Sequence, residues 1–144
     1  MSRKILIGII ALLILVIGFQ TFTNEANSEN RTETAVESQI SANALSASEA
    51  IGYVGSKRTV CGNVVSANYA SGSKGKPTFL NLDKNYPNQI FTILIWGDNR
   101  SNFPEAPEIF YRNQKVCASG LIEAYKGVPQ IEAITSTQVK IVDR

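Results

Sequence analysis

Five segments of strand length, all between residues 59 and 142, constrain the fold of this 144-residue chain more than any other feature. They are rich in Val, Ile, Phe and Thr, which favour strands, and several alternate apolar with polar residues. Gly62 inside the first segment predicts a bulge or a sharp bend, and the fifth segment is expected to be interrupted around Ser136. The predicted strands are residues 59–69, 78–83, 90–96, 115–125 and 129–142.

Two short helices are predicted between these strands. Ser46 and Glu49 have the S-x-x-E spacing of a capping box ahead of the first strand. Pro104 and Pro107 fit first-turn positions of a helix, or an irregular wrap, between the third and fourth strands. The order strand, strand, strand, helix, strand, strand is that of an OB-fold, although other small barrels stay open. We therefore predict a mainly β protein, a five-stranded OB-fold barrel with a short helix before strand 1 and another between strands 3 and 4.

The first 22 residues predict a transmembrane or signal helix. Arg3 and Lys4 precede an uncharged apolar run over residues 5–19. Extended to Phe22, the run reaches the lower end of the roughly 20 residues that cross a bilayer. A cleaved signal peptide has the same charged start, so an uncleaved anchor and a cleaved signal both stay open. Because the positive charges precede the run, the remainder of the chain is expected on the extracytoplasmic side.

A polar, acidic stretch at residues 23–45 follows the apolar run. It has almost no large apolar side chains and is predicted to be a disordered linker. The folded domain is expected to span residues 46–144.

The charge and residue types restrict the possible chemistry. Residues 46–144 carry eleven Lys or Arg and eight Asp or Glu, a weak basic bias that does not by itself mark a nucleic-acid binder. The chain has no histidine, which excludes histidine-based catalysis and Ser-His-Asp triads. Two cysteines cannot form a four-ligand structural zinc site. We predict that the protein is not an enzyme and has neither metal nor cofactor, and that its carboxylates lie on the solvated surface.

Cys61 and Cys117 are predicted to form a disulfide. Each lies early in its strand, on the parity opposite to the valine-rich face, and the first and fourth strands of an OB-fold are neighbours. Export would permit oxidation. The alternative is a pair of buried free thiols.

The candidate ligand surface follows from where an OB-fold binds, which is the face of strands 2 and 3 flanked by two loops. Those loops are residues 71–76 and 125–127, and both contain glycine and lysine. Single-stranded nucleic acid requires cations for its phosphates and flat side chains for its bases. Tyr86 is flat, but Tyr86-Pro87-Asn88 is typical of a turn; Trp96 and Phe79 are also candidates for the core. The predicted binding residues are Lys74, Lys76, Phe79, Asn81, Trp96, Tyr125 and Lys126.

Several motifs resemble one protein family. V-C-G, G-x-P-T-F-L-N-L, Y-P-N-Q-x-F-T, I-W-G and Y-K-G-x-P-Q-I, spread over residues 46–142, resemble small bacterial OB-fold domains that are described as nucleic-acid-binding-like and are often exported. The barrel is also distantly similar to that of staphylococcal-type nucleases. Asp83, Asp98 and Arg100 are isolated and do not reproduce the catalytic pattern of those nucleases, so the resemblance implies no catalytic residue here.

Together these features predict an exported, membrane-tethered binding module. Its expected partner is single-stranded DNA or RNA, bound with low specificity through the strand 2–3 face and the loops 71–76 and 125–127. The alternatives are a non-enzymatic module that binds another protein, or one that binds a glycan of the cell envelope.

Overall fold

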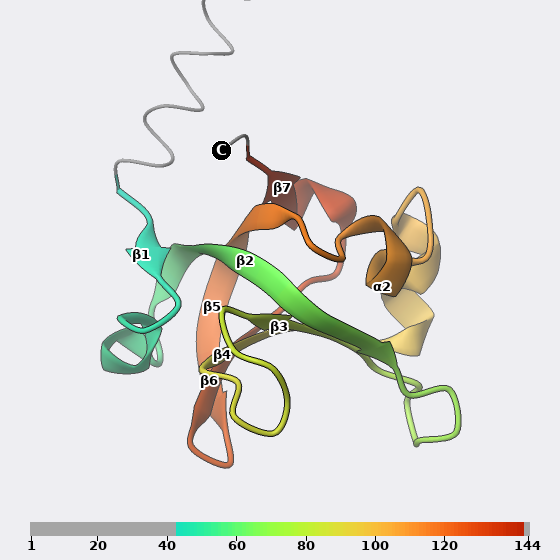
Figure 1. Ribbon diagram of the computed structural model, residues 1–144, viewed down its shortest axis with the longest axis horizontal. Coiled ribbons are helices and arrows are strands. Elements are labelled where there is room, and N and C mark those ends of the chain that lie inside the picture. Colours follow the sequence, from blue (N-terminus) through green and yellow to red (C-terminus); the bar gives the residue numbers. More distant parts are fainter. Residues whose placement is uncertain (1–42, 143–144) are drawn as a thin grey trace, which may run out of the picture. The chain divides into compact units, whose positions relative to one another are not determined.

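The computed structural model describes residues 43–142, which form a mainly β domain, as predicted (Figure 1). Its helices are short: three 3₁₀ helices, η1 (Ala50–Tyr53), η2 (Gly97–Asn102) and η3 (Ser136–Gln138), and one α-helix, α2 (Pro107–Phe110). In this range the sheet has seven strands, namely β1 (Leu45–Ser46), β2 (Lys57–Tyr69), β3 (Thr78–Leu82), β4 (Phe91–Ile95), β5 (Lys115–Tyr125), β6 (Val128–Glu132) and β7 (Val139–Ile141).

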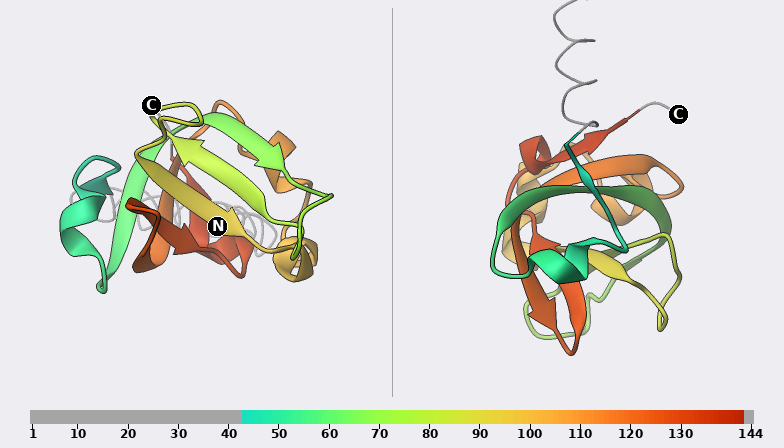
Figure 2. Two further views of the ribbon diagram at one scale, coloured as in Figure 1. Left: turned by 90° about the horizontal axis from the view of Figure 1, so that it is seen from below. Right: turned by 90° about the vertical axis from the view of Figure 1, so that its left-hand side faces the viewer.

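Five of the strands pair in a closed ring. The order along the sheet is β1-β2-β3-β4-β6-β5-β7, and β2 also pairs with β5, so that β2, β3, β4, β6 and β5 each have two ring neighbours (Figure 2). The ring pairs are antiparallel except β4 with β6, which is parallel. The short strands β1 and β7 add to the outer edges of β2 and β5.

The long strand β2 belongs to two ladders at once. Residues 57–63 pair with β5, whereas residues 64–69 pair with β3. The register shifts between Val64 and Ser66, and such a bulge bends the strand and increases its twist. The bulge therefore lies beyond Gly62, which pairs regularly with Val116. The lack of a side chain at Gly62 instead lets the Asp83 carboxylate lie close to the backbone, because a Cβ at residue 62 would be only 2.9 Å from that carboxylate.

The hydrophobic core follows from strand alternation. Leu80 and Leu82 on β3 and Ile93 on β4 are fully buried, so the intervening side chains of these strands face outward. Other fully buried core side chains come from β2, β5 and β6, including Val60, Val64, Val116, Ile122 and Ile131. The inward-facing residues of all five ring strands thus supply one core, which leaves the outer face of the ring free for a site.

The segment between β4 and β5 is attached to the ring by Arg100. Its guanidinium donates to both carboxylate oxygens of Glu108, at 2.7 and 3.2 Å, and also to the Thr78 hydroxyl. The same group lies over the Tyr69 ring, 3.7 Å from its centroid. Hydrogen bonding to Arg100 holds the pKa of Glu108 below its ordinary value. This cluster joins η2 and α2 to the adjacent ends of β2 and β3.

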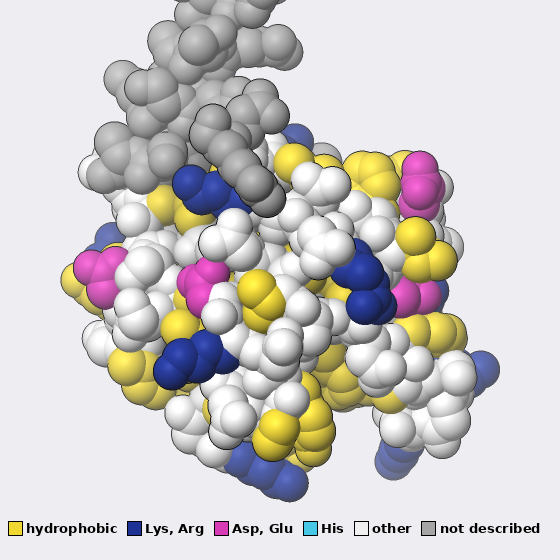
Figure 3. Space-filling model, viewed as in Figure 1, with side chains coloured by type: hydrophobic (Ala, Val, Ile, Leu, Met, Phe, Trp, Pro, Cys, Tyr) yellow, Lys and Arg dark blue, Asp and Glu magenta, His cyan; other side chains and the backbone are white. Residues whose placement is uncertain are grey.

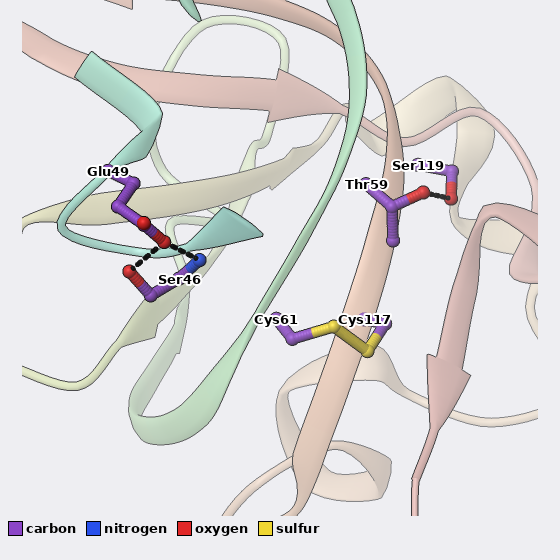
Figure 4. Close-up of a disulfide and its surroundings, with 6 residues drawn as sticks. All are labelled: Ser46, Glu49, Thr59, Cys61, Cys117 and Ser119. Carbon is purple, nitrogen blue, oxygen red and sulfur yellow. Dashed lines mark hydrogen bonds between the residues drawn. A yellow bond between two sulfur atoms is a disulfide. The ribbon is translucent and has the colours of Figure 1, made fainter. Parts of the chain in front are cut away.

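The predicted disulfide is confirmed. Cys61 on β2 and Cys117 on β5 face each other directly and are bridged, with their Cα atoms 4.0 Å apart (Figure 4). The next outward-facing pair along the same ladder is Thr59 and Ser119, whose hydroxyls are hydrogen-bonded at 2.8 Å. The bridge therefore lies at the β2–β5 pairing that closes the ring.

One expectation about local structure was confirmed and another was wrong. The fifth predicted strand is interrupted around Ser136 as expected, because β6 ends at Glu132, η3 covers Ser136–Gln138 and β7 begins at Val139. The Ala133 amide donates to Leu94, and a capping box between Thr135 and Gln138 then starts η3. The S-x-x-E motif, however, does not cap a helix at Ser46, since η1 begins four residues later. The Glu49 carboxylate instead accepts from the amide and the hydroxyl of Ser46, the last residue of β1.

The predicted anchor or signal at residues 1–22 lies outside the described residues, as does most of the predicted linker at 23–45. Leu45, the last linker residue, forms part of β1 and packs against the core. Within residues 43–142, every helix is too short to span a bilayer.

Candidate functional site

A groove of about 450 Å³ lies on the outer face of the ring. Its volume falls within the roughly 300–1,000 Å³ range of ligand sites. The lining comes from all five ring strands and the loop 83–90. The lining residues are Ser66, Asn68, Phe79, Asn81, Tyr86, Gln89, Thr92, Tyr125, Val128 and Gln130.

The floor of the groove is a row of uncharged polar side chains. Ser66, Asn81, Thr92 and Gln130 lie opposite one another on β2, β3, β4 and β6. The Thr92 hydroxyl donates to Asn81 Oδ1 at 3.0 Å, and Asn81 Nδ2 donates to Ser66 Oγ at 3.0 Å. Asn81 and Thr92 are each only 5 % exposed. Since the Asn81 amide is already paired at both ends, it organises the floor and is a poor candidate for direct contact with a ligand.

Three aromatic side chains line the same groove. Phe79 is half-buried on β3, opposite Asn68. Tyr86 in the loop 83–90 is 75 % exposed and Tyr125 at the end of β5 is 61 % exposed. Flat side chains that remain this open are available to stack on a planar ligand.

The turn that follows Tyr125 places a lysine at the edge of the groove. Lys126 and Gly127 both have positive φ, 50° and 84°, as the type I′ turn of a two-residue hairpin requires. The Lys126 ammonium lies 5.3 Å from the centroid of the Tyr125 ring. A second exposed cation, Lys84, lies in the loop 83–90, two residues before the groove residue Tyr86.

Charge is absent from the groove lining itself: its ten residues are uncharged. On the face shown in Figure 3, the basic side chains lie in several separate places and do not form one continuous patch. A ligand in this groove would therefore contact aromatic, amide and hydroxyl groups, and any anionic part of it would meet cations only at the edge.

The structure brings together some of the predicted binding residues. Phe79, Asn81 and Tyr125 line the groove, and Lys126 adjoins it. Lys74 and Lys76 lie on the loop 70–77 and are not part of the lining. Trp96, which directly follows β4, is not part of the lining either.

The position of Trp96 has a local cause. The amide of the next residue, Gly97, donates to the Gly75 carbonyl at 2.9 Å. A Cβ on Gly75 would lie 2.9 Å from the Trp96 ring. The indole thus packs against the loop 70–77 instead of pointing into the groove.

Sequence reasoning missed six lining residues and set a seventh, Tyr86, aside as a turn residue. For Ser66, Asn68 and Thr92 a signal existed, because polar residues recur at outward positions of otherwise apolar strands. Gln130 follows the same rule on β6. Gln89 and Tyr86 belong to a loop without periodicity, so no pattern could place them. The full set of missed residues is Ser66, Asn68, Gln89, Thr92, Val128 and Gln130.

The described residues do not contain a metal centre. Within residues 43–142, Asp, Glu and Cys side chains do not gather in groups of three that could hold a metal ion. The two shifted pKa values near α2 have structural causes: the hydrogen bond from Arg100 lowers the pKa of Glu108, and burial raises the pKa of Tyr111. Neither residue lines the groove.

Comparison with known proteins does not identify a family. No protein-family model matches the chain, and no curated protein matches its sequence. An OBody bound to hen egg-white lysozyme is 18 % identical with a TM-score of 0.41, over 65 % of this chain and 85 % of that one. A protein assigned as an aspartyl-tRNA synthetase from Leishmania major Friedlin is 10 % identical with a TM-score of 0.43, over 68 % of this chain and 20 % of that one. Both TM-scores are low, and neither likeness carries an argument about function.

Proposed function

We propose that the ring is an OB-fold and that its groove binds single-stranded nucleic acid, with bases in the groove and phosphates at its edge. The observation that carries the proposal is the combination of three aromatic side chains over an uncharged polar floor, with lysines outside the lining. The ring order supports the fold assignment, because an OB-fold closes its first strand on its fourth and presents strands 2 and 3 to ligands.

Stacking would supply most of the affinity. Tyr86 and Tyr125 expose most of their surface, and Phe79 is a half-buried residue of the same lining. Base–aromatic stacking contributes about 1–3 kcal/mol per base and tolerates any base, because every base has a π-face. This accounts for a module with low sequence specificity.

Lysines at the edge would contact the phosphates. Lys126 lies beside Tyr125, Lys84 precedes Tyr86, and Lys74 and Lys76 belong to the loop that follows β2. Each phosphate neutralised on a single strand lowers the salt slope of log K by about 0.7. Two to four such contacts would therefore give a slope of about −1.4 to −2.8, which is a moderate dependence.

The test is a titration of the full chain, in mild detergent, against labelled single-stranded DNA and RNA at about 50 and about 200 mM salt. We expect saturable binding that weakens at the higher salt. Tyr125→Ala and Tyr86→Ala should each weaken binding by about 5- to 150-fold. The matched control is Tyr53→Ala, which removes an exposed tyrosine outside the groove and should leave binding unchanged. Absence of binding at the lower salt would refute the proposal.

A second candidate, a neutral oligosaccharide, is favoured by one specific observation. The lining contains amides and hydroxyls beside aromatic rings and no charged side chain, and OB-folds also bind oligosaccharides. Binding of an envelope glycan would depend on Tyr125 but would be insensitive to salt. A protein partner would give a third pattern. If the chain captures another protein, the complex persists at moderate salt, and Tyr125→Ala has no effect, the domain is instead a protein-interaction module.

We also propose that the domain acts outside the cytoplasm as a non-enzymatic module tethered to the membrane. The disulfide is compatible with an oxidising compartment, and the apolar run at residues 5–19 provides the candidate anchor. The location is testable by protease accessibility of the domain in intact cells, where protection from added protease would contradict it.

A further inference from the structure

One buried side-chain polar atom in residues 43–142 has no hydrogen-bond partner: it is Oε1 of Gln89, a residue of the groove lining. Buried acceptors are almost always paired, because an unpaired one loses its water without compensation. A residue that violates this rule requires a physical reason.

The amides of Asn81 and Gln138, by contrast, are paired. The Asn81 amide bonds to Thr92 and Ser66. Gln138 accepts from the amides of Ile134 and Thr135 at 2.8 and 3.2 Å, and its nitrogen donates to the Ser119 carbonyl. The domain therefore satisfies the amides that it uses structurally, and Gln89 differs from them.

We propose that Gln89 determines the base preference of the groove, an inference that rests on the proposed function. The terminal torsion of a glutamine is broad, so a partial rotation, without exchange of the amide oxygen and nitrogen, brings the oxygen toward a ligand and needs no backbone movement. Its unpaired oxygen is an acceptor and requires an N–H donor. Cytosine and adenine present an exocyclic amino group, whereas thymine and uracil present a carbonyl at that position. The groove is therefore selective for amino-bearing bases.

The proposal predicts opposite effects on stability and on selectivity. Replacing Gln89 by methionine keeps the length of the side chain and removes the unpaired oxygen. Gln89→Met should therefore raise the midpoint of thermal unfolding by a few degrees while abolishing the preference for amino-bearing bases. A residue with a purely structural role would lower the midpoint and would leave the preference intact.

The experiment compares binding of the full chain to oligo-dC and oligo-dT, two pyrimidine strands of equal charge. We expect the wild type to bind oligo-dC at least about fivefold more tightly. Gln89→Met should bring the ratio close to one. Gln89→Glu, which only accepts, should keep the preference for oligo-dC at a lower overall affinity. The matched control is Gln114→Met, which makes the same change at an exposed glutamine outside the groove and should not alter the ratio.

The outcomes separate this inference from the proposed function. Binding with equal affinity for both strands, a preference for oligo-dT, or a preference that survives Gln89→Met would overturn the role of Gln89 alone. Lack of binding to both strands would overturn the proposed function and the base preference with it. A lower unfolding midpoint for Gln89→Met would also count against the role of Gln89.

Discussion

Removal of the Cys61–Cys117 disulfide should cost about 4 kcal/mol of unfolding free energy. The bridge closes a loop with a sequence separation of 56 residues. In the loop-closure model this restricts the unfolded chain by about 14 cal/mol/K, which is about 4 kcal/mol at 25 °C. The folded state should change little, because the two residues remain paired across the β2–β5 ladder. Loss of the bridge therefore acts mainly through the unfolded chain.

The assay is urea unfolding of the wild type, the reduced wild type and the Cys61→Ala/Cys117→Ala variant. The reduced protein retains the sulfur atoms, so agreement between it and the double variant assigns the loss to the covalent link. A matched control is Thr59→Val/Ser119→Ala, the adjacent outward pair, which is joined by a 2.8 Å hydrogen bond. We expect that control to lose only about 1 kcal/mol or less.

Two results would refute this reasoning. A loss below about 1 kcal/mol in the reduced protein would mean that the bridge does not restrict the unfolded ensemble as the loop-closure model states. A loss restricted to the alanine variant would mean that burial of sulfur, with Cys117 only 2 % exposed, accounts for the effect. Ligand binding well below the unfolding midpoint should be retained, because the groove uses β2 only beyond the bulge.

Two further predictions concern the region around the loop 70–77 and η2. Glu108→Gln should cost about 1–2 kcal/mol at neutral pH by weakening a charge-assisted bond to Arg100. Because the pKa of Glu108 is lowered in the folded state, the ionised carboxylate stabilises the fold fully above pH 4.5, the ordinary pKa of the group. This stabilisation is lost as the pH falls through the folded pKa. The difference in unfolding free energy between wild type and Glu108→Gln, measured by urea unfolding, should therefore become smaller at acidic pH. A difference that does not change with pH would contradict the role of the Glu108 charge. Gly75→Ala should destabilise by about 1–3 kcal/mol, because φ is +76° and the new Cβ meets Trp96. The fluorescence of this single tryptophan reports the change, whereas Gly72→Ala, in open space, should be neutral.

The strands were predictable where local pattern decides them. The strand at residues 115–125 was predicted with the bounds that β5 has, while β3 is one residue shorter than predicted at one end and β4 is one residue shorter at each end. The break around Ser136 in residues 129–142 was predicted but its extent was not, because β6 already ends at Glu132, where the Ala133 amide bonds to Leu94 on a strand distant in the sequence. Such a contact overrides the local preference of the segment and leaves no mark in its own residues.

Parity was a reliable guide to the disulfide and a partial guide to the groove. It placed Cys61 opposite Cys117, and it put Phe79 and Asn81 outside because Leu80 and Leu82 are inside. It did not place Trp96 correctly, because apolar and polar residues do not alternate in the segment I-L-I-W. The loop 83–90 was out of reach, because its conformation depends on turns and not on a period.

Lys76 and Lys126 both lie in turns, in a backbone conformation that lysine seldom adopts. Among residues 43–142, four non-glycine residues have a positive φ. Asn113 is of a type that tolerates this region, and Asp83 offsets its strain by accepting from the Asn63 amide at 2.8 Å. Lys76 and Lys126 have φ of 45° and 50°, where glycine or asparagine would be less strained. Their ammonium groups form no ion pair within the described range. Backbone preference therefore does not favour lysine at these two positions, and contact with phosphates is the role that we propose for their charge.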